Sequence, residues 1–188
     1  LSVFGFSFFW QPVLFLFLTQ TKELLPSQAL WLVSLYSLGV VILEVPGGAV
    51  ADHYSRKLSA GLGYTLKGLG FFSLTLFTHT YGLIASMFII SLGESLTSGS
   101  LESLMYDSIK QSKELTSKYF KHVVAKTRVI LHFSLAIFIA LGGYIGQYNL
   151  TLPLQLSVIG YLIAALLTTR LIEPTKVFTN RGYLQHIL

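Results

Sequence analysis

The sequence predicts an all-α membrane protein, a bundle of six transmembrane helices, and three observations carry this prediction. Charged residues make up only 11% of the 188 residues, compared with about 25% in a typical soluble domain. Hydrophobic residues make up 53%, and the mean hydropathy is +0.66. Six apolar runs of about twenty residues follow one another, and a helix of this length crosses the hydrocarbon core. The chain therefore lacks the charged surface of an ordinary cytosolic enzyme.

Helices account for these runs better than barrel strands do. A barrel strand needs only about 9–11 residues and alternates apolar with polar positions. These runs are longer and are apolar on nearly all sides, and an open sheet would leave its backbone unsatisfied in lipid. We expect helices over six ranges: about 1–19, 30–50, 58–77, 81–105, 128–145 and 152–172.

The first three runs are separated by short polar segments. Pro12, which follows Gln11, predicts a kink in the first helix because proline cannot donate the helical hydrogen bond. Residues 20–28 connect the first run to the second, and the charged segment 51–57 connects the second to the third. These breaks delimit the first three helices.

The last three runs follow the same plan, with one long connection. The breaks after the third, fourth and fifth runs are residues 78–80, 106 to about 126, and 146–151. The second of these is rich in lysine. Glu173 and Pro174 end the sixth run, so we expect a bundle over residues 1–172 and the start of a cytoplasmic central loop over 173–188.

Lysine and arginine predict the orientation of the bundle. Lys67 lies inside the third run, and Lys22 lies in a connection on one side of the membrane. The other eleven fall on the opposite side, which the positive-inside rule makes cytoplasmic. We therefore expect both chain ends to be cytoplasmic and the protein to lie in the plasma (inner) membrane. The eleven are Arg56, Lys57, Lys110, Lys113, Lys118, Lys121, Lys126, Arg128, Arg170, Lys176 and Arg181.

Several functional classes are not expected from this sequence. The chain has no cysteine, and its five histidines show no metal-ligand spacing, so neither a metal nor a cofactor is expected. No H-E-x-x-H, G-x-S-x-G or phosphate-binding glycine motif indicates an enzyme. The net charge of +5 does not indicate nucleic-acid binding, because the basic residues lie between apolar runs.

The strongest local signal lies between the second and third runs, where residues 48–57 read G-A-V-A-D-H-Y-S-R-K. This segment resembles the G-x-L-A-D-x-x-G-R-K signature of the major facilitator superfamily at Gly48, Ala51, Asp52, Arg56 and Lys57. A valine replaces the usual leucine, and a serine replaces the second glycine. The resemblance extends over nearly the whole chain, including Glu44-Val45-Pro46 and Tyr106-Asp107.

The resemblance implies a twelve-helix transporter of which this chain is the amino-terminal half, with two inverted three-helix repeats. A weak likeness between Gly47-Gly48 and Gly142-Gly143 agrees with such a repeat. The implied partners are a small-molecule substrate, the lipid bilayer, the second six-helix half and, for coupling, protons. The resemblance also assigns a cytoplasmic gate to Gly48, Asp52, Arg56, Lys57 and Asp107. The alternative is a plain positive-inside loop with one aspartate.

The fourth run carries a polar stripe that shares one helical face. Its members are Ser91, Glu94, Ser95, Ser98 and Glu102. Glu94 lies near mid-depth, where a carboxylate faces a cavity or a partner. Lys67 lies at a similar depth, so the two residues form either a structural ion pair or a proton or substrate site. Because the resemblance implies that the third helix is peripheral, we favour a cavity-facing Glu94 that Lys67 does not neutralise.

Four further residues are weaker candidates for the cavity or the coupling site. Glu44 lines the cavity or braces the gate, and we favour bracing. Arg128 and His132 either meet an anionic substrate or serve as a snorkelling arginine and a hydrogen-bonded histidine, and the second reading is favoured. Gln11 lies in an aromatic-rich helix that faces either a cavity for amphipathic substrates or the lipid.

These observations predict the amino-terminal half of a secondary active transporter. It would move a small solute by alternating access, with proton coupling through a membrane carboxylate. The alternative is a non-transporting six-helix membrane protein, either a receptor-like binding module or an intramembrane enzyme. An intramembrane enzyme needs a nucleophile and a base at matched depth, and the sequence offers no such pair.

Overall fold

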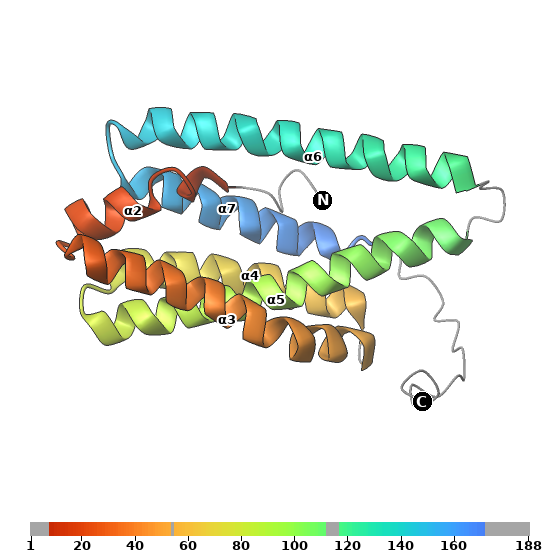
Figure 1. The fold of residues 1–188 in the computed structure, drawn as a ribbon, viewed down its shortest axis with the longest axis horizontal. Helices are drawn as coiled ribbons and strands as arrows, with labels where there is room; N and C mark the ends of the chain where they lie inside the picture. The colour runs from red at the N-terminus through yellow and green to blue at the C-terminus, as the bar shows by residue number, and fades with distance from the viewer. Residues whose placement is uncertain (1–7, 54, 112–116, 172–188) are drawn as a thin grey trace.

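The computed structural model describes residues 8–53, 55–111 and 117–171. Within these ranges it describes the side chains at all positions except 52–53, 101–111 and 117–124. Every regular element in this part of the chain is helical, which confirms the all-α prediction. Five long helices are α3 (Pro26–His53), α4 (Arg56–Leu76), α5 (Thr80–Gln111), α6 (Ser117–Gly146) and α7 (Thr151–Thr168). They lie roughly alongside one another (Figure 1).

The first predicted helix is broken in its described part. A short 3-10 turn, η1 (Phe8–Trp10), is followed by a turn at residues 11–13, by α2 (Leu14–Leu16) and by the π-helical segment η2 (Phe17–Thr21). The sequence predicted one kinked helix. The break coincides with Pro12, which has no N–H to donate and disfavours a helical conformation in the residue before it. Just before this break, the backbone N–H of Trp10 donates to Ser157 Oγ of α7 at 3.2 Å.

Helices α3 and α4 begin with residues suited to helix starts. Pro26 occupies the first position of α3, where its missing N–H costs nothing. Ser55 is the N-cap of α4, and its Oγ accepts a hydrogen bond from Leu58 N at 3.2 Å. Helix α3 begins four residues before the predicted range and ends three residues after it. Helix α4 closely matches its predicted range.

Helices α5 and α6 extend well into the lysine-rich connection that the sequence placed at 106 to about 126. Helix α5 continues to Gln111, and α6 begins at Ser117. Lysine, glutamine and leucine are good helix formers, so a polar helix end can continue into water without a break. Helix α7 ends at Thr168, four residues before the predicted end.

The helices are arranged as layers across the bundle (Figure 1). Helix α6 runs along one edge and contacts η1 and α7, while α4 packs between α7 and α5. Helix α3 covers α5 on the opposite side. The buried core lies where η1, η2, α4, α5 and α7 meet. Its largest fully buried side chains include Tyr64, Tyr161, Phe17, Phe71, Leu18 and Leu154.

Four helices in the described part of the chain are long and apolar enough to cross a membrane. These spans are Pro26–Ala51, Thr80–Ser100, Ala125–Gly146 and Thr151–Thr168. Helix α4 has sufficient length, but its glycines and Lys67 lower its hydropathy. The spans in α3 and α6 are only 11% buried, so these two helices expose most of their apolar surface in this chain.

Candidate functional site

A buried ion pair joins α4 and α5 at the centre of the bundle. The Lys67 ammonium nitrogen lies 2.8 Å from Glu94 Oε2. The Lys67 side chain is 3% exposed, and that of Glu94 is 25% exposed. The prediction that Lys67 does not neutralise Glu94 is therefore wrong. Helix α4 is not peripheral, because it packs against both α5 and α7.

Two glycines explain why Lys67 reaches Glu94. A Cβ atom added to Gly63 would lie 2.7 Å from Gly93 O, and one added to Gly93 would lie 2.6 Å from Gly63 O. Real Cβ atoms do not approach backbone atoms so closely, so the contact between α4 and α5 requires glycine at both positions. The close approach brings the stem of Lys67 over α5 and its ammonium group to the carboxylate.

Aromatic rings surround the ammonium group of Lys67. Its nitrogen lies 4.6 Å from the centroid of the Tyr161 ring and 5.4 Å from that of Tyr64. Both distances lie within the range of cation–π attraction, which is stronger for a desolvated cation than for an exposed one. Tyr161 is fully buried in α7, and Tyr64 lies one turn before Lys67 on α4. The cation is thus held by two aromatic faces and one carboxylate.

The phenol of Tyr161 connects this centre to the broken first segment. Trp10 Nε1 donates a hydrogen bond to Tyr161 Oη at 2.9 Å. The Phe71 ring packs against Trp10 and stacks on Tyr161, with centroid distances of 4.9 Å and 5.7 Å. Trp10 also meets Tyr36 of α3 edge to face at 6.3 Å. One aromatic cluster therefore joins the first segment, α3, α4 and α7 around the ion pair.

The polar stripe on α5 does not face a cavity along its whole length. Ser91 is buried, and its Oγ donates to Tyr36 O of α3 at 3.0 Å. Ser95 is also buried, and a Cβ atom added to Gly47 of α3 would lie 2.9 Å from its Oγ. These two serines allow α3 to pack closely on α5. Glu94 lies between them in the sequence but turns toward α4.

The predicted gate residues lie only partly within the described side chains. Gly48, Arg56 and Lys57 are half-buried near the ends of α3 and α4 that face each other. A Cβ atom added to Gly99 of α5 would lie 3.4 Å from Gly48 Cα, so these two helices are close at this point. The side chains of Asp52, Glu102 and Asp107 lie outside the described part of the structure. Asp52 and Asp107 nevertheless fall in the last turns of α3 and α5.

The weaker candidates lie away from the ion pair. Gln11 is exposed in the turn after η1, and Glu44 is exposed on α3. Arg128 and His132 are exposed on α6, where His132 Nδ1 lies 2.7 Å from Arg128 O. This hydrogen bond is consistent with the favoured interpretation of His132 as a hydrogen-bonded histidine. None of these four side chains joins the aromatic cluster.

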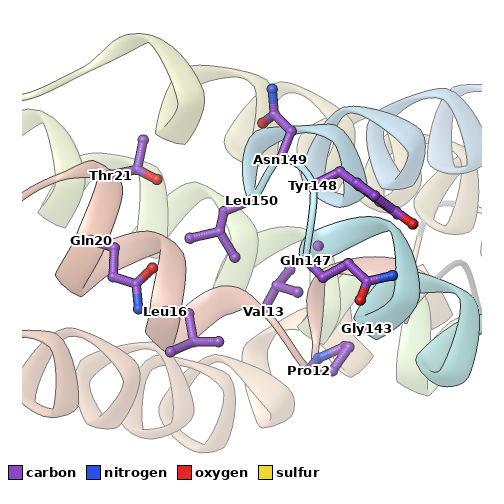
Figure 2. A pocket seen from close by; sticks show the side chains of 11 residues that line it. Pro12, Val13, Leu16, Gln20, Thr21, Gly143, Gln147, Tyr148, Asn149 and Leu150 are labelled. Atoms are coloured by element: carbon purple, nitrogen blue, oxygen red, sulfur yellow. The ribbon is translucent and has the colours of Figure 1, made fainter.

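A hollow of about 560 Å³ lies at the end of the bundle where η2 meets the connection between α6 and α7. Figure 2 shows Gln20 and Gln147 on opposite sides of this hollow. Its lining is otherwise a mixture of apolar and uncharged polar residues, and it includes none of the residues of the ion pair or the aromatic cluster. At the same end, Lys22 Nζ donates to Thr75 O at 2.8 Å, and partial burial lowers the pKa of Lys22.

Metal chemistry finds no support in the described part of the chain. No three histidine, aspartate or glutamate side chains among the described residues lie close enough together to hold an ion. The arrangement instead suits the binding of charge in a low-dielectric setting. Ionisable groups within a membrane bundle are costly and usually belong to a substrate or ion pathway.

The comparisons with known proteins show the family of the chain. Residues 1–182 match the family model of the Major Facilitator Superfamily. The chain belongs to this family. One curated relative, the uncharacterized MFS-type transporter YxaM of Bacillus subtilis (strain 168), is 27% identical over 143 residues. The match covers 76% of this chain and 34% of the relative, so the chain spans about a third of that protein's length.

Membership of this family confirms the resemblance inferred from residues 48–57 and makes the chain a multi-pass membrane protein. Members of the family are transporters, which is consistent with the expectation that the chain is not an enzyme. The sequence analysis named Lys67 and Glu94 but missed their surroundings. Tyr64, three residues before Lys67, and Tyr161, a phenol inside an apolar run, were the available signals.

Proposed function

We propose that this chain is the amino-terminal half of a secondary active transporter that moves a small solute by alternating access. In the complete protein, a second six-helix half packs against this bundle, and the solute path lies between the halves. The broken first segment and α4 complete a set of six spans with α3, α5, α6 and α7. The spans form two inverted three-helix repeats. The protein lies in the plasma (inner) membrane with both ends of this chain in the cytoplasm.

The observation that carries the proposal is the Lys67–Glu94 ion pair, buried between α4 and α5 of a chain that belongs to a transporter family. Burying two charges costs several kcal/mol per ion, and the attraction between them offsets that cost only partly. A bundle built for stability alone would place apolar residues here. Retention of both charges supports a site that binds or exchanges charge.

We further propose that the transporter is coupled to protons through Glu94. Glu94 is the more accessible member of the pair, because a quarter of its side chain is exposed while Lys67 is almost fully buried. Protonation of Glu94 removes one side of the pair and leaves Lys67 held by Tyr64 and Tyr161 alone. The energy of the α4–α5 contact therefore depends on the charge of Glu94.

The cytoplasmic gate completes the proposal. Arg56 begins α4, and Asp107 belongs to the last turns of α5, the helix against which α4 packs. An arginine at this position suits bidentate pairing with a carboxylate. Gly48 and Asp52 belong to the end of α3 that precedes Arg56 and Lys57, and Glu44 braces this end from one turn before Gly48.

The test is flux into vesicles that contain the purified full-length protein. A pH-sensitive dye inside the vesicles reports proton movement when candidate solutes are added outside. We expect at least one solute to give saturable proton movement that Glu94→Gln abolishes. Saturable uptake that is independent of the pH gradient would refute proton coupling but would still support transport. The absence of saturable flux for every solute, under imposed gradients of either direction, would refute the transporter itself.

A further inference from the structure

We propose that the Lys67–Glu94 centre recognises a monovalent organic cation, with Glu94 as the group that contacts it. The proposal rests on the transporter function above and specifies the chemical class of its substrate. It follows from an asymmetry within the ion pair. The two charges are equal in size but unequal in accessibility, with side-chain exposures of 3% for Lys67 and 25% for Glu94.

The first step concerns which charge a solute can reach. The ammonium group of Lys67 is enclosed by the rings of Tyr64 and Tyr161 and by Glu94 itself. An anionic solute would have to displace these groups to contact it. Glu94 is the more exposed member of the pair, so a solute that reaches the pair meets the acidic side chain first. A cation is attracted to this side chain, and an anion is repelled from it.

The second step concerns the capacity of the carboxylate. An ionised carboxylate has two oxygens and about four lone-pair positions. Lys67 occupies a position on Oε2, and it is the salt-bridge partner found for Glu94 among the described residues. The remaining positions can accept hydrogen bonds from a protonated amine. Hydrogen bonds between two charged groups are short and about twice as strong as those between neutral groups.

The third step concerns the apolar part of the solute. Tyr36 of α3 lies beside α5 one turn before Glu94, because its backbone oxygen accepts a hydrogen bond from Ser91 Oγ at 3.0 Å. Tyr36 is half-buried and meets Trp10 edge to face, whereas Tyr64 and Tyr161 are fully buried against Lys67. Aromatic faces attract organic cations through the ring quadrupole as well as through apolar contact. A carboxylate close to a partly exposed aromatic ring is therefore suited to an amine that carries an apolar or aromatic group.

The experiment uses three probes of similar size that differ in charge: phenethylammonium, 2-phenylethanol and 3-phenylpropionate. Each is titrated calorimetrically into the purified full-length protein in detergent. We expect phenethylammonium to bind at least about ten-fold more tightly than 2-phenylethanol, because it adds hydrogen bonds to a charged acceptor. We expect 3-phenylpropionate to bind most weakly of the three.

Two variants locate the effect. Glu94→Gln should lower the affinity for phenethylammonium to that of the alcohol and leave the affinity for the alcohol unchanged. Glu23→Gln removes a carboxylate that is exposed in the connection before α3, and it should change neither affinity. The ranking of the three probes on the unmodified protein also tests the proposal, so it stays falsifiable if Glu94→Gln does not fold.

Equal or tighter binding of 3-phenylpropionate, or of the alcohol, would overturn the proposal, as would an unchanged phenethylammonium affinity in Glu94→Gln. A failure of all three probes to bind also overturns it. These outcomes are separable from failure of the proposed function. If a neutral or anionic solute shows saturable flux and the three probe affinities do not follow the expected order, the cation class is refuted but transport is still supported. If the probe affinities follow the expected order but no solute shows flux, the binding site is supported and the transporter is refuted.

Discussion

The Lys67 ammonium lies 2.8 Å from Glu94 Oε2, beside a point where glycines let the backbones of α4 and α5 approach closely. A Cβ atom added to Gly93 would lie 2.7 Å from both Lys67 N and Lys67 Cγ. The helix contact and the ion pair are therefore built from the same few residues. A change in the charge of either partner acts on the packing of α4 against α5, and a change in that packing acts on the pair.

The two members of the pair should respond unequally to removal of their partner. Glu94→Leu leaves the almost fully buried Lys67 charge unpaired, which should destabilise the protein by about 3–5 kcal/mol. Lys67→Met leaves Glu94 unpaired, but this side chain is partly exposed, so the loss should be smaller. The double variant should be more stable than Glu94→Leu. Denaturant unfolding in detergent measures all three.

Lys126→Met serves as the control for this series, because Lys126 is exposed on α6. The stability of this variant should equal that of the unmodified protein. A double variant whose loss of stability equals the sum of the two single losses would show that the two charges do not interact energetically.

Close packing of α4 on α5 should not tolerate a methyl group. We expect Gly63→Ala and Gly93→Ala each to destabilise the protein by about 1–3 kcal/mol, because the added carbon meets backbone atoms that cannot move independently. Gly143→Ala is the matched control, since the nearest atom to its added carbon is Pro12 Cβ at 4.0 Å. Thermal unfolding distinguishes them, and similar losses at positions 63 and 143 would contradict the packing argument.

The hydrogen bond from Trp10 to Tyr161 should couple the first segment to α7. Trp10→Phe and Tyr161→Phe each remove one partner and leave the other unsatisfied in the core, at a cost of about 1–3 kcal/mol. The double variant should lose less than the sum of the two, with a coupling energy of about 1 kcal/mol. Trp31→Phe, at an exposed tryptophan on α3, should have little effect. Strict additivity of the Trp10 and Tyr161 changes would mean that the bond does not contribute.

The orientation of the bundle can be measured with single cysteines, because this chain contains none. In a cysteine-free background of the full-length protein, His79→Cys should react with a membrane-impermeant maleimide added to intact cells. Lys126→Cys should react only after permeabilisation, because it belongs to the basic side that the positive-inside rule makes cytoplasmic. Both positions are exposed, so burial does not mask the reaction. The reverse labelling pattern would overturn the predicted topology.

The proposed gate makes the two basic residues at the start of α4 unequal. Arg56→Ala should impair transport more than Lys57→Ala, because only arginine can pair with a carboxylate through two parallel hydrogen bonds. The amount of protein in the membrane should stay near normal in both variants. Flux in vesicles is the readout, with immunoblotting to normalise for protein. Equal losses of transport in the two variants would contradict the gate contact and would favour a plain positive-inside loop.

Much of the fold was predictable because the lengths of the apolar runs and the positions of the basic residues do not depend on which segments contact one another. Helices α3, α4 and α7 lie close to the ranges predicted from hydropathy. The predictions were poorest at the polar ends of α5 and α6, since a helix continues into water wherever the residues are good helix formers. The break near Pro12 was expected as a kink. The hydrogen bond from Trp10 N to Ser157 Oγ joins positions 147 residues apart, so the local sequence did not predict it.

Composition, periodicity and a ten-residue motif were enough to predict that the protein lies in a membrane, that it is helical and that it resembles its family, because none of these features depends on distant contacts. The positions of Lys67 and Glu94 also placed two charges at similar depth. Their pairing could be seen only in the folded chain, because it depends on how closely α4 approaches α5, and that distance is set by Gly63 and Gly93 together. The aromatic enclosure of Lys67 likewise needed the packing of α7 on α4, which brings Tyr161 to a cation 94 positions earlier in the chain.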